Sequence, residues 1–154
     1  MLALMLRLIA LFMLLATPAW AEVLSYPALD GRADARVVTV YSSLDEPLAR
    51  PIIAAFQKAN PDIAVAYEDM QTSDIYERVV RETDSGASTA DFAFSSAMDL
   101  QVKLANDGYA QESHVPLSAR WPGWANWRDT AYALTYEPAV FIYHKPDFAG
   151  TRPP

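Results

Sequence analysis

The chain contains no cysteine and only two histidines, His114 and His144. Without cysteine, the protein has neither disulfides nor thiolate ligands, and it is indifferent to the redox state of its compartment. The two histidines lack the close spacing of a metal-binding pair, so we expect each of them to be a surface or packing residue. The residues themselves therefore predict no metal site and no cofactor.

The chain also lacks the short motifs of common enzymes. It has no G-x-S-x-G elbow, no G-x-G-x-x-G loop and no Walker loop. Ser42 or Ser43 as a nucleophile would need a general base, and nothing in the local sequence places either histidine beside them. We predict that the protein is not an enzyme, and a secreted hydrolase is the least favoured alternative.

Basic residues are scarce. Lys and Arg number 12 against 19 Asp and Glu, and the formal net charge is −7. This balance argues against nucleic acid as a partner, because binding to phosphate backbones depends on basic side chains. An anionic small molecule remains possible, since a local group of backbone N–H donors can hold an anion on an acidic protein.

The first 21 residues have the pattern of a secretory signal peptide. An apolar run spans Leu8–Leu15, and Ala19-Trp20-Ala21 matches the small-x-small cleavage pattern. The alternative is an uncleaved membrane anchor, but the run is short for a span of ~20 residues. Glu22 rather than cysteine follows, which argues against a lipid anchor. We predict cleavage near Ala21 and a soluble periplasmic protein.

The rest of the chain alternates between strand and helix patterns. Residues 22–35 lack a helical or strand period and are predicted to be an exposed leader. Strands are then predicted at 36–41, 62–68 and 91–95, and helices at 46–59, at 73–85 and from Ser96 onward. This alternation predicts an α/β fold, a three-layer sandwich with a mainly parallel sheet. Residues 109–128 are predicted to form an ordered loop, and 129–136 and 139–144 to form strands.

Two apolar patterns carry packing predictions. The first helix is expected to bury a stripe at helical spacing, formed by Leu48, Ile52, Ile53, Phe56 and Ala59. Trp121, Trp124 and Trp127 recur every three residues, and we favour packing within the core or loop for them over lining of a cleft.

Hydrogen-bonding side chains follow three of the predicted strands, as Ser42-Ser43, Asp69-Gln71-Thr72 and Ser95-Ser96. Each serine alone is better explained as a helix cap, a role worth ~1 kcal/mol. Together, at the carboxyl edge of a parallel sheet, they favour a ligand site, because ligands bind there and helix N-termini attract anions.

Three segments carry a family resemblance: V-V-T-V-Y-S-S-L-D-E-P from Val37, D-F-A-F-S-S-A-M-D-L-Q from Asp91, and A-Y-A-L-T-Y-E-P-A-V-F-I-Y-H-K from Ala131. They resemble periplasmic substrate-binding proteins of ABC importers, in the group that binds ferric iron, organophosphates or phosphoglycerate. The resemblance implies a type II periplasmic-binding-protein-like fold with two α/β lobes hinged around a ligand. Residues 36–136 would form the first lobe. Residues 137–154 would form the hinge crossing and the start of an absent second lobe, which makes the chain a fragment.

The resemblance also implies roles. The four serines would contact the ligand, and Tyr136 and Glu137 would lie at the hinge beside the cleft. The ligand would be a phosphorylated or carboxylated solute or ferric iron, and the partner an inner-membrane ABC permease. We expect a monomer. The alternative is a periplasmic sensing module that binds the same solute and signals to a membrane sensor kinase.

Overall fold

The computed structural model describes residues 23–113, 120–136, 138–140, 142 and 144. The chain divides into two compact units, Met1–Tyr109 and Ala110–Pro154, and each is described by itself. The predicted first lobe, residues 36–136, crosses this division, and its boundaries stay a prediction. The predicted signal peptide lies outside the described residues. Within the described part of the chain, no helix is long and apolar enough to cross a membrane.

The first unit is built on a four-stranded sheet with the order β1-β3-β2-β4. β2 runs parallel to both β3 and β4, whereas β1 runs antiparallel to β3. The prediction of a mainly parallel α/β fold is therefore confirmed. The strands are β1 (Val23–Tyr26), β2 (Arg36–Ser42), β3 (Ile63–Asp69) and β4 (Phe92–Phe94), and the helices are α2 (Glu46–Ala59), α3 (Thr72–Asp84) and α4 (Met98–Asn106).

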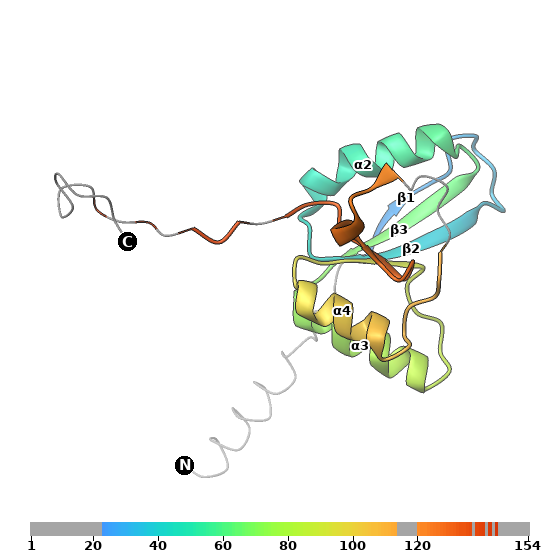
Figure 1. The fold of residues 1–154 in the computed structure, drawn as a ribbon. Helices are drawn as coiled ribbons and strands as arrows, with labels where there is room; N and C mark the ends of the chain where they lie inside the picture. The colour runs from blue at the N-terminus through green and yellow to red at the C-terminus, as the bar shows by residue number, and fades with distance from the viewer. Residues whose placement is uncertain (1–22, 114–119, 137, 141, 143, 145–154) are drawn as a thin grey trace, which may run out of the picture. The chain divides into compact units, whose positions relative to one another are not determined.

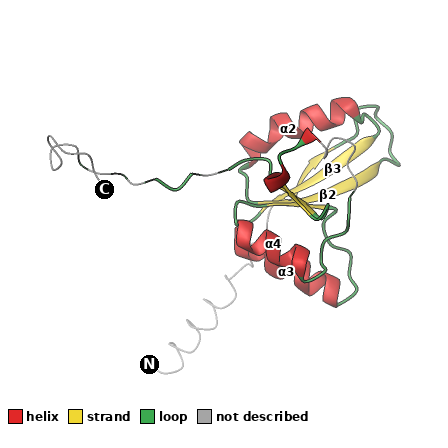
Figure 2. Ribbon diagram, viewed as in Figure 1, coloured by secondary structure: helices red, strands yellow, loops and turns green. Residues whose placement is uncertain are grey.

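Helices cover both faces of this sheet, as Figures 1 and 2 show, with α2 on one face and α3 and α4 on the other. Neighbouring residues of a strand point to opposite faces, so each face has its own core. Tyr41 packs with Ile75, Val79 and Leu104 on the α3 and α4 face. On the α2 face the core consists of Ala49, Ile53, Val65 and Tyr67. The predicted three layers are thus confirmed within this unit.

The bounds of α2 match the prediction, but the predicted buried stripe is largely wrong. Ala49 and Ile53 are buried, whereas Leu48 and Ile52 are 60% and 58% exposed. The third buried residue of the helix is Gln57, and not a large apolar residue. Its Nε2 donates to three backbone carbonyls, at distances of 3.2 Å to Tyr26, 2.9 Å to Pro27 and 3.2 Å to Ile63.

The prediction that residues 22–35 contain no strand is also wrong. β1 pairs with β3 from Val23 opposite Glu68 to Tyr26 opposite Val65. Its four residues are too short for a recognisable period, and the strand exists because β3 offers an open edge and Gln57 binds the carbonyl at its end. Residues 23–26 are therefore part of the sheet, whereas residues 27–35 contain no strand and are mostly exposed, as predicted.

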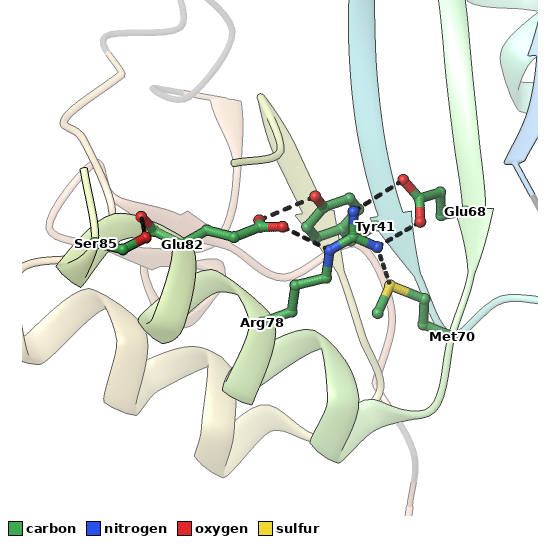
Figure 3. Close-up of polar contacts among 6 residues, drawn as sticks. All are labelled: Tyr41, Glu68, Met70, Arg78, Glu82 and Ser85. Atoms are coloured by element: carbon green, nitrogen blue, oxygen red, sulfur yellow. Dashed lines mark hydrogen bonds and ion pairs between the residues drawn. The ribbon is translucent and has the colours of Figure 1, made fainter. Parts of the chain in front are cut away.

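The α3 face carries an ionic cluster around Arg78 (Figure 3). The Arg78 guanidinium forms ion pairs with Glu68 on β3 and, at 2.8 Å, with Glu82 one turn along α3. It also lies over the Tyr41 ring, 4.2 Å from the centroid, and the Tyr41 hydroxyl donates to Glu82 at 3.0 Å. Burial, and then the bond to Glu82, raise the pKa of Tyr41 to about 12. The cluster thereby fastens α3 to the two central strands.

The second unit contains short elements: η2 (Gly123–Ala125), β5 (Asn126–Trp127) and β6 (Ala131–Tyr132). β5 and β6 pair antiparallel, and Arg128 and Asp129 in the turn between them have φ of 55° and 56°. The Asn126 side chain stabilises this turn by accepting from Asp129 N at 2.9 Å. The loop predicted at 109–128 is confirmed only in part, because η2 and β5 lie within its described residues. The strand predicted at 129–136 is confirmed only at Ala131–Tyr132, and that at 139–144 lies partly outside the described residues.

Candidate functional site

The ends of β2 and β4 bring the predicted serines together. In the parallel register Ser42 lies opposite Phe94, and Ser43 N donates to Phe94 O at 3.0 Å. The two strands therefore end at the same level, and Ser43 lies beside the turn that begins at Ser95. The prediction that the serine pairs share one edge of the sheet is confirmed. We call Ser43, Ser95 and Ser96 the serine edge.

The serine edge is joined across the two turns by hydrogen bonds. Ser96 N donates to Ser43 Oγ at 3.3 Å, and Ala97 N donates to Ser95 Oγ at 3.1 Å. The hydroxyl oxygens of Ser43 and Ser95 therefore act as acceptors toward the protein, and their own protons can still be donated to another acceptor. A hydroxyl that accepts a hydrogen bond becomes a better donor, so the edge is suited to a ligand that offers oxygen acceptors.

Ser42 lies behind this edge. Its residue is only 1% exposed, and its Oγ accepts from Leu44 N at 3.0 Å. The Tyr67 hydroxyl donates to the carbonyl of the same Leu44. Ser42 therefore shapes the turn into α2, and its burial does not support the prediction of a direct ligand contact.

The starts of the helices differ from the prediction. Ser96 was expected to cap α4, but the N-cap is Ala97, and no side chain forms a cap hydrogen bond there. The N-cap of α2 is Asp45, and it also forms no side-chain cap hydrogen bond. Exposed Asp45 and Asp69, which ends β3 opposite Ser42, add negative charge to this region. The serine edge would therefore attract an acceptor mainly through its hydroxyl protons, and less through the positive electrostatic field at the N-termini of α2 and α4.

Tyr136 and Glu137 were expected beside the serines. Tyr136 belongs to the second unit and is 78% exposed, with its ring 6.3 Å from that of Trp124. Glu137 lies outside the described residues. The contact of these two residues with the serine edge stays a prediction. Among the described residues, no three His, Cys, Asp or Glu side chains gather as a possible metal site.

Sequence reasoning missed the Arg78 cluster. It also favoured packing over the lining of a cleft for the tryptophans, whereas Trp121 and Trp124 line a hollow in the second unit and Trp124 is 65% exposed. The spacing of Arg78 and Glu82, four residues apart on a helix, was a visible signal for an ion pair. No local signal indicated Glu68 or Tyr41 as their partners, because those contacts depend on the packing of α3 against the sheet.

Comparison with solved structures identifies a similar protein. A crystal structure of the substrate binding protein of the ABC transporter from Agrobacterium tumefaciens shares 70% sequence identity with this chain, at a TM-score of 0.76. This chain is similar to an ABC-transporter substrate-binding protein. The match covers 90% of this chain and 41% of that one. No family model matches the chain, and no curated protein does.

This comparison supports the broad resemblance seen in the sequence, namely that to substrate-binding proteins of ABC transporters. The narrower assignment to the group that binds ferric iron, organophosphates or phosphoglycerate is not tested. Because the chain spans less than half of the solved neighbour, the activity and partners of a whole protein are a matter for proposal.

Proposed function

We propose that this chain is the first lobe of a periplasmic substrate-binding protein that captures a small solute for an ABC permease in the inner membrane. The observation that carries the proposal is the 70% identity to a solved substrate-binding protein over 90% of this chain. The three-layer unit with a mainly parallel sheet agrees with such a lobe. A binding role without catalysis also agrees with the absence of enzyme motifs from the sequence.

We propose that the solute is anionic and that the serine edge contacts its charged group. Ser43 Oγ and Ser95 Oγ each accept a backbone hydrogen bond, which leaves their protons to donate to ligand oxygens. Phosphate and carboxylate groups offer several such oxygens. Ferric iron is the weaker alternative, because hydroxyl donors are poor partners for a cation. Tyr136 and Glu137 stay proposed contacts on the hinge side.

Thermal unfolding in the presence of candidate solutes tests this proposal. The 154-residue chain is heated with phosphate, phosphate esters, organic acids or ferric salts, and the midpoint is compared with that of the protein alone. A solute that binds only the folded state raises the midpoint with its concentration. We expect stabilisation by at least one anionic solute and a smaller effect in Ser43→Ala. Stabilisation by none of them would contradict solute capture.

The identity of the membrane protein that binds this chain distinguishes a transport role from a sensing role. Immobilised protein, loaded with the solute found above and mixed with solubilised inner membranes, should retain a permease. Retention of a sensor kinase in its place would overturn the transport proposal in favour of the sensing alternative.

A further inference from the structure

Tyr67 belongs to the core of the first unit, and its hydroxyl reaches the turn that carries Ser43. The residue lies on β3, opposite Val40 of β2, and it is only 3% exposed. Its ring packs in the core under α2. The hydroxyl extends past the end of β2 and donates to the carbonyl of Leu44. A core residue is thereby joined to the turn on which the serine edge begins.

Side chains hold both backbone polar groups of Leu44. Its N–H donates to Ser42 Oγ at 3.0 Å, and its carbonyl accepts from the Tyr67 hydroxyl. The Leu44 side chain packs, partly buried, against the same core as the Tyr67 ring. Burial raises the pKa of Tyr67, so the hydroxyl keeps its proton at neutral pH and stays a donor. The backbone of Leu44 is therefore fixed from the core.

Ser43 lies between buried Ser42 and this fixed Leu44. Its own N–H donates to Phe94 O at 3.0 Å, which ties its backbone to β4. Rotation of the side chain is its main remaining freedom, and the bond that Ser43 Oγ accepts from Ser96 N at 3.3 Å restricts it. A donor that is held in place before a ligand arrives binds that ligand with a smaller loss of conformational entropy. The bonds around Leu44 therefore matter for binding at Ser43.

We propose that Tyr67 is a positioning residue of the serine edge, which holds Ser43 in place through the hydrogen bond from its hydroxyl to the carbonyl of Leu44. This inference rests on the proposed function, because it gives Tyr67 a role in solute binding that acts through Ser43. The competing explanation is that the Tyr67 hydroxyl only stabilises the fold. A positioning role differs from it by changing the bond between Ser96 N and Ser43 Oγ even without solute.

Tyr41 offers a matched control for Tyr67. It lies on the neighbouring strand β2 and is 2% exposed, and its hydroxyl donates to Glu82 at 3.0 Å (Figure 3). Its ring packs on the opposite face of the sheet from Tyr67 and Leu44. Replacement by phenylalanine keeps the ring in both cases and removes one hydroxyl hydrogen bond. Only Tyr67→Phe releases the carbonyl of Leu44, so a loss of stability alone should affect the two variants alike.

Backbone NMR of the 154-residue chain without solute tests the positioning itself. In Tyr67→Phe we expect the Ser96 amide signal to shift and its hydrogen exchange to become faster, because a displaced Ser43 Oγ accepts its bond less well. Ser42→Ala removes the acceptor of Leu44 N and should change the same signal. Tyr41→Phe should leave it in place. An unchanged Ser96 amide in Tyr67→Phe, or equal changes in the two tyrosine variants, would overturn the proposal.

Titration with inorganic phosphate, followed by the same amide signals, tests the consequence for binding. We expect an affinity about threefold lower in Tyr67→Phe, because the Ser43 hydroxyl is displaced but not removed, and an unchanged affinity in Tyr41→Phe. Equal affinity of Tyr67→Phe and the unchanged protein for phosphate would overturn the positioning role. Failure of phosphate to bind the unchanged protein would count against the proposed anion contact, and the Ser96 amide without solute still decides whether Tyr67 positions Ser43.

Discussion

The two faces of the sheet in the first unit are held by different means. On the α3 face, large apolar residues point inward and the Arg78 cluster joins the helix to β2 and β3. On the α2 face, the helix buries small Ala49, Ile53 and the amide of Gln57, while larger apolar residues stay outside. Both faces therefore have an apolar core, and they differ in the polar contact added to it, which is charge pairing on the α3 face and satisfied backbone carbonyls on the α2 face.

This difference shows why apolar periodicity predicted one helix better than the other. On α3 the helical period indicates Ile75, Tyr76, Val79 and Val80 as inward residues; Ile75 and Val79 are buried, and the other two are partly buried against the same core. On α2 the backbone carbonyls near the end of β1 needed donors, and a buried polar residue with good hydrogen bonds displaced the apolar stripe. An unsatisfied buried carbonyl costs about 1–3 kcal/mol, which is comparable to the gain from burying one large side chain.

The largest expected effect comes from breaking the Arg78 cluster. Arg78→Met leaves the 7%-exposed Glu68 without its cation, which should lower the free energy of unfolding by about 4 kcal/mol. Arg50→Met is the control, because the Arg50–Glu46 pair is an exposed i,i+4 pair expected to contribute less than about 0.5 kcal/mol. Urea unfolding measures both. Equal losses in the two variants would show that the cluster does not fasten α3.

The orientation of α2 can be tested with two neighbouring isoleucines. Ile53→Ala opens a cavity in the core and should cost about 3 kcal/mol. Ile52→Ala removes the same atoms from a side that is 58% exposed and should cost less than about 0.5 kcal/mol. Urea unfolding of the two variants shows which isoleucine of α2 faces the core. A larger loss for Ile52→Ala would show that Ile52, and not Ile53, faces the core.

A smaller loss is expected at Gln57. Gln57→Leu keeps the bulk of the side chain but removes the donor to the Tyr26, Pro27 and Ile63 carbonyls, which should cost about 2 kcal/mol. Hydrogen exchange of the β1 amides should also become faster than that of the β2 amides. If β1 stays as protected as in the unchanged protein, Gln57 does not hold this strand.

The smallest expected effect is a loss of folding stability at alkaline pH that comes from Tyr41. The pKa of Tyr41 rises in the fold from 10.0 to about 12, mainly through burial. The unfolded chain therefore loses this proton first, so stability is fully present below pH 10 and declines as the pH rises through about 12. The free energy of unfolding of Tyr41→Phe should decline less between pH 10 and 12 than that of the unchanged protein. If chemical unfolding gives the same dependence of this free energy on pH for both proteins, Tyr41 is not the group responsible.

The sequence predicted the sheet type, the bounds of α2 and the meeting of the serine pairs, because each depends on local periods and on one topological rule. It could not predict β1, whose four residues are a strand only beside β3. Nor could it separate Ser42 from Ser43, since the burial of Ser42 follows from the turn around Leu44. Contacts between distant residues, such as Glu68 with Arg78, leave no trace in a local pattern.

The central claim is that the serine edge contacts an anionic solute, and backbone NMR tests it most directly. The solute that raises the unfolding midpoint most is titrated into the 154-residue chain while the amide signals of Ser43, Ser96 and Ala97 are followed. The account predicts saturable shifts at these three amides, with affinity at least about tenfold lower in Ser43→Ala, since one charge-assisted hydrogen bond is lost. Saturable shifts confined to other residues, or affinity unchanged in Ser43→Ala, would contradict it.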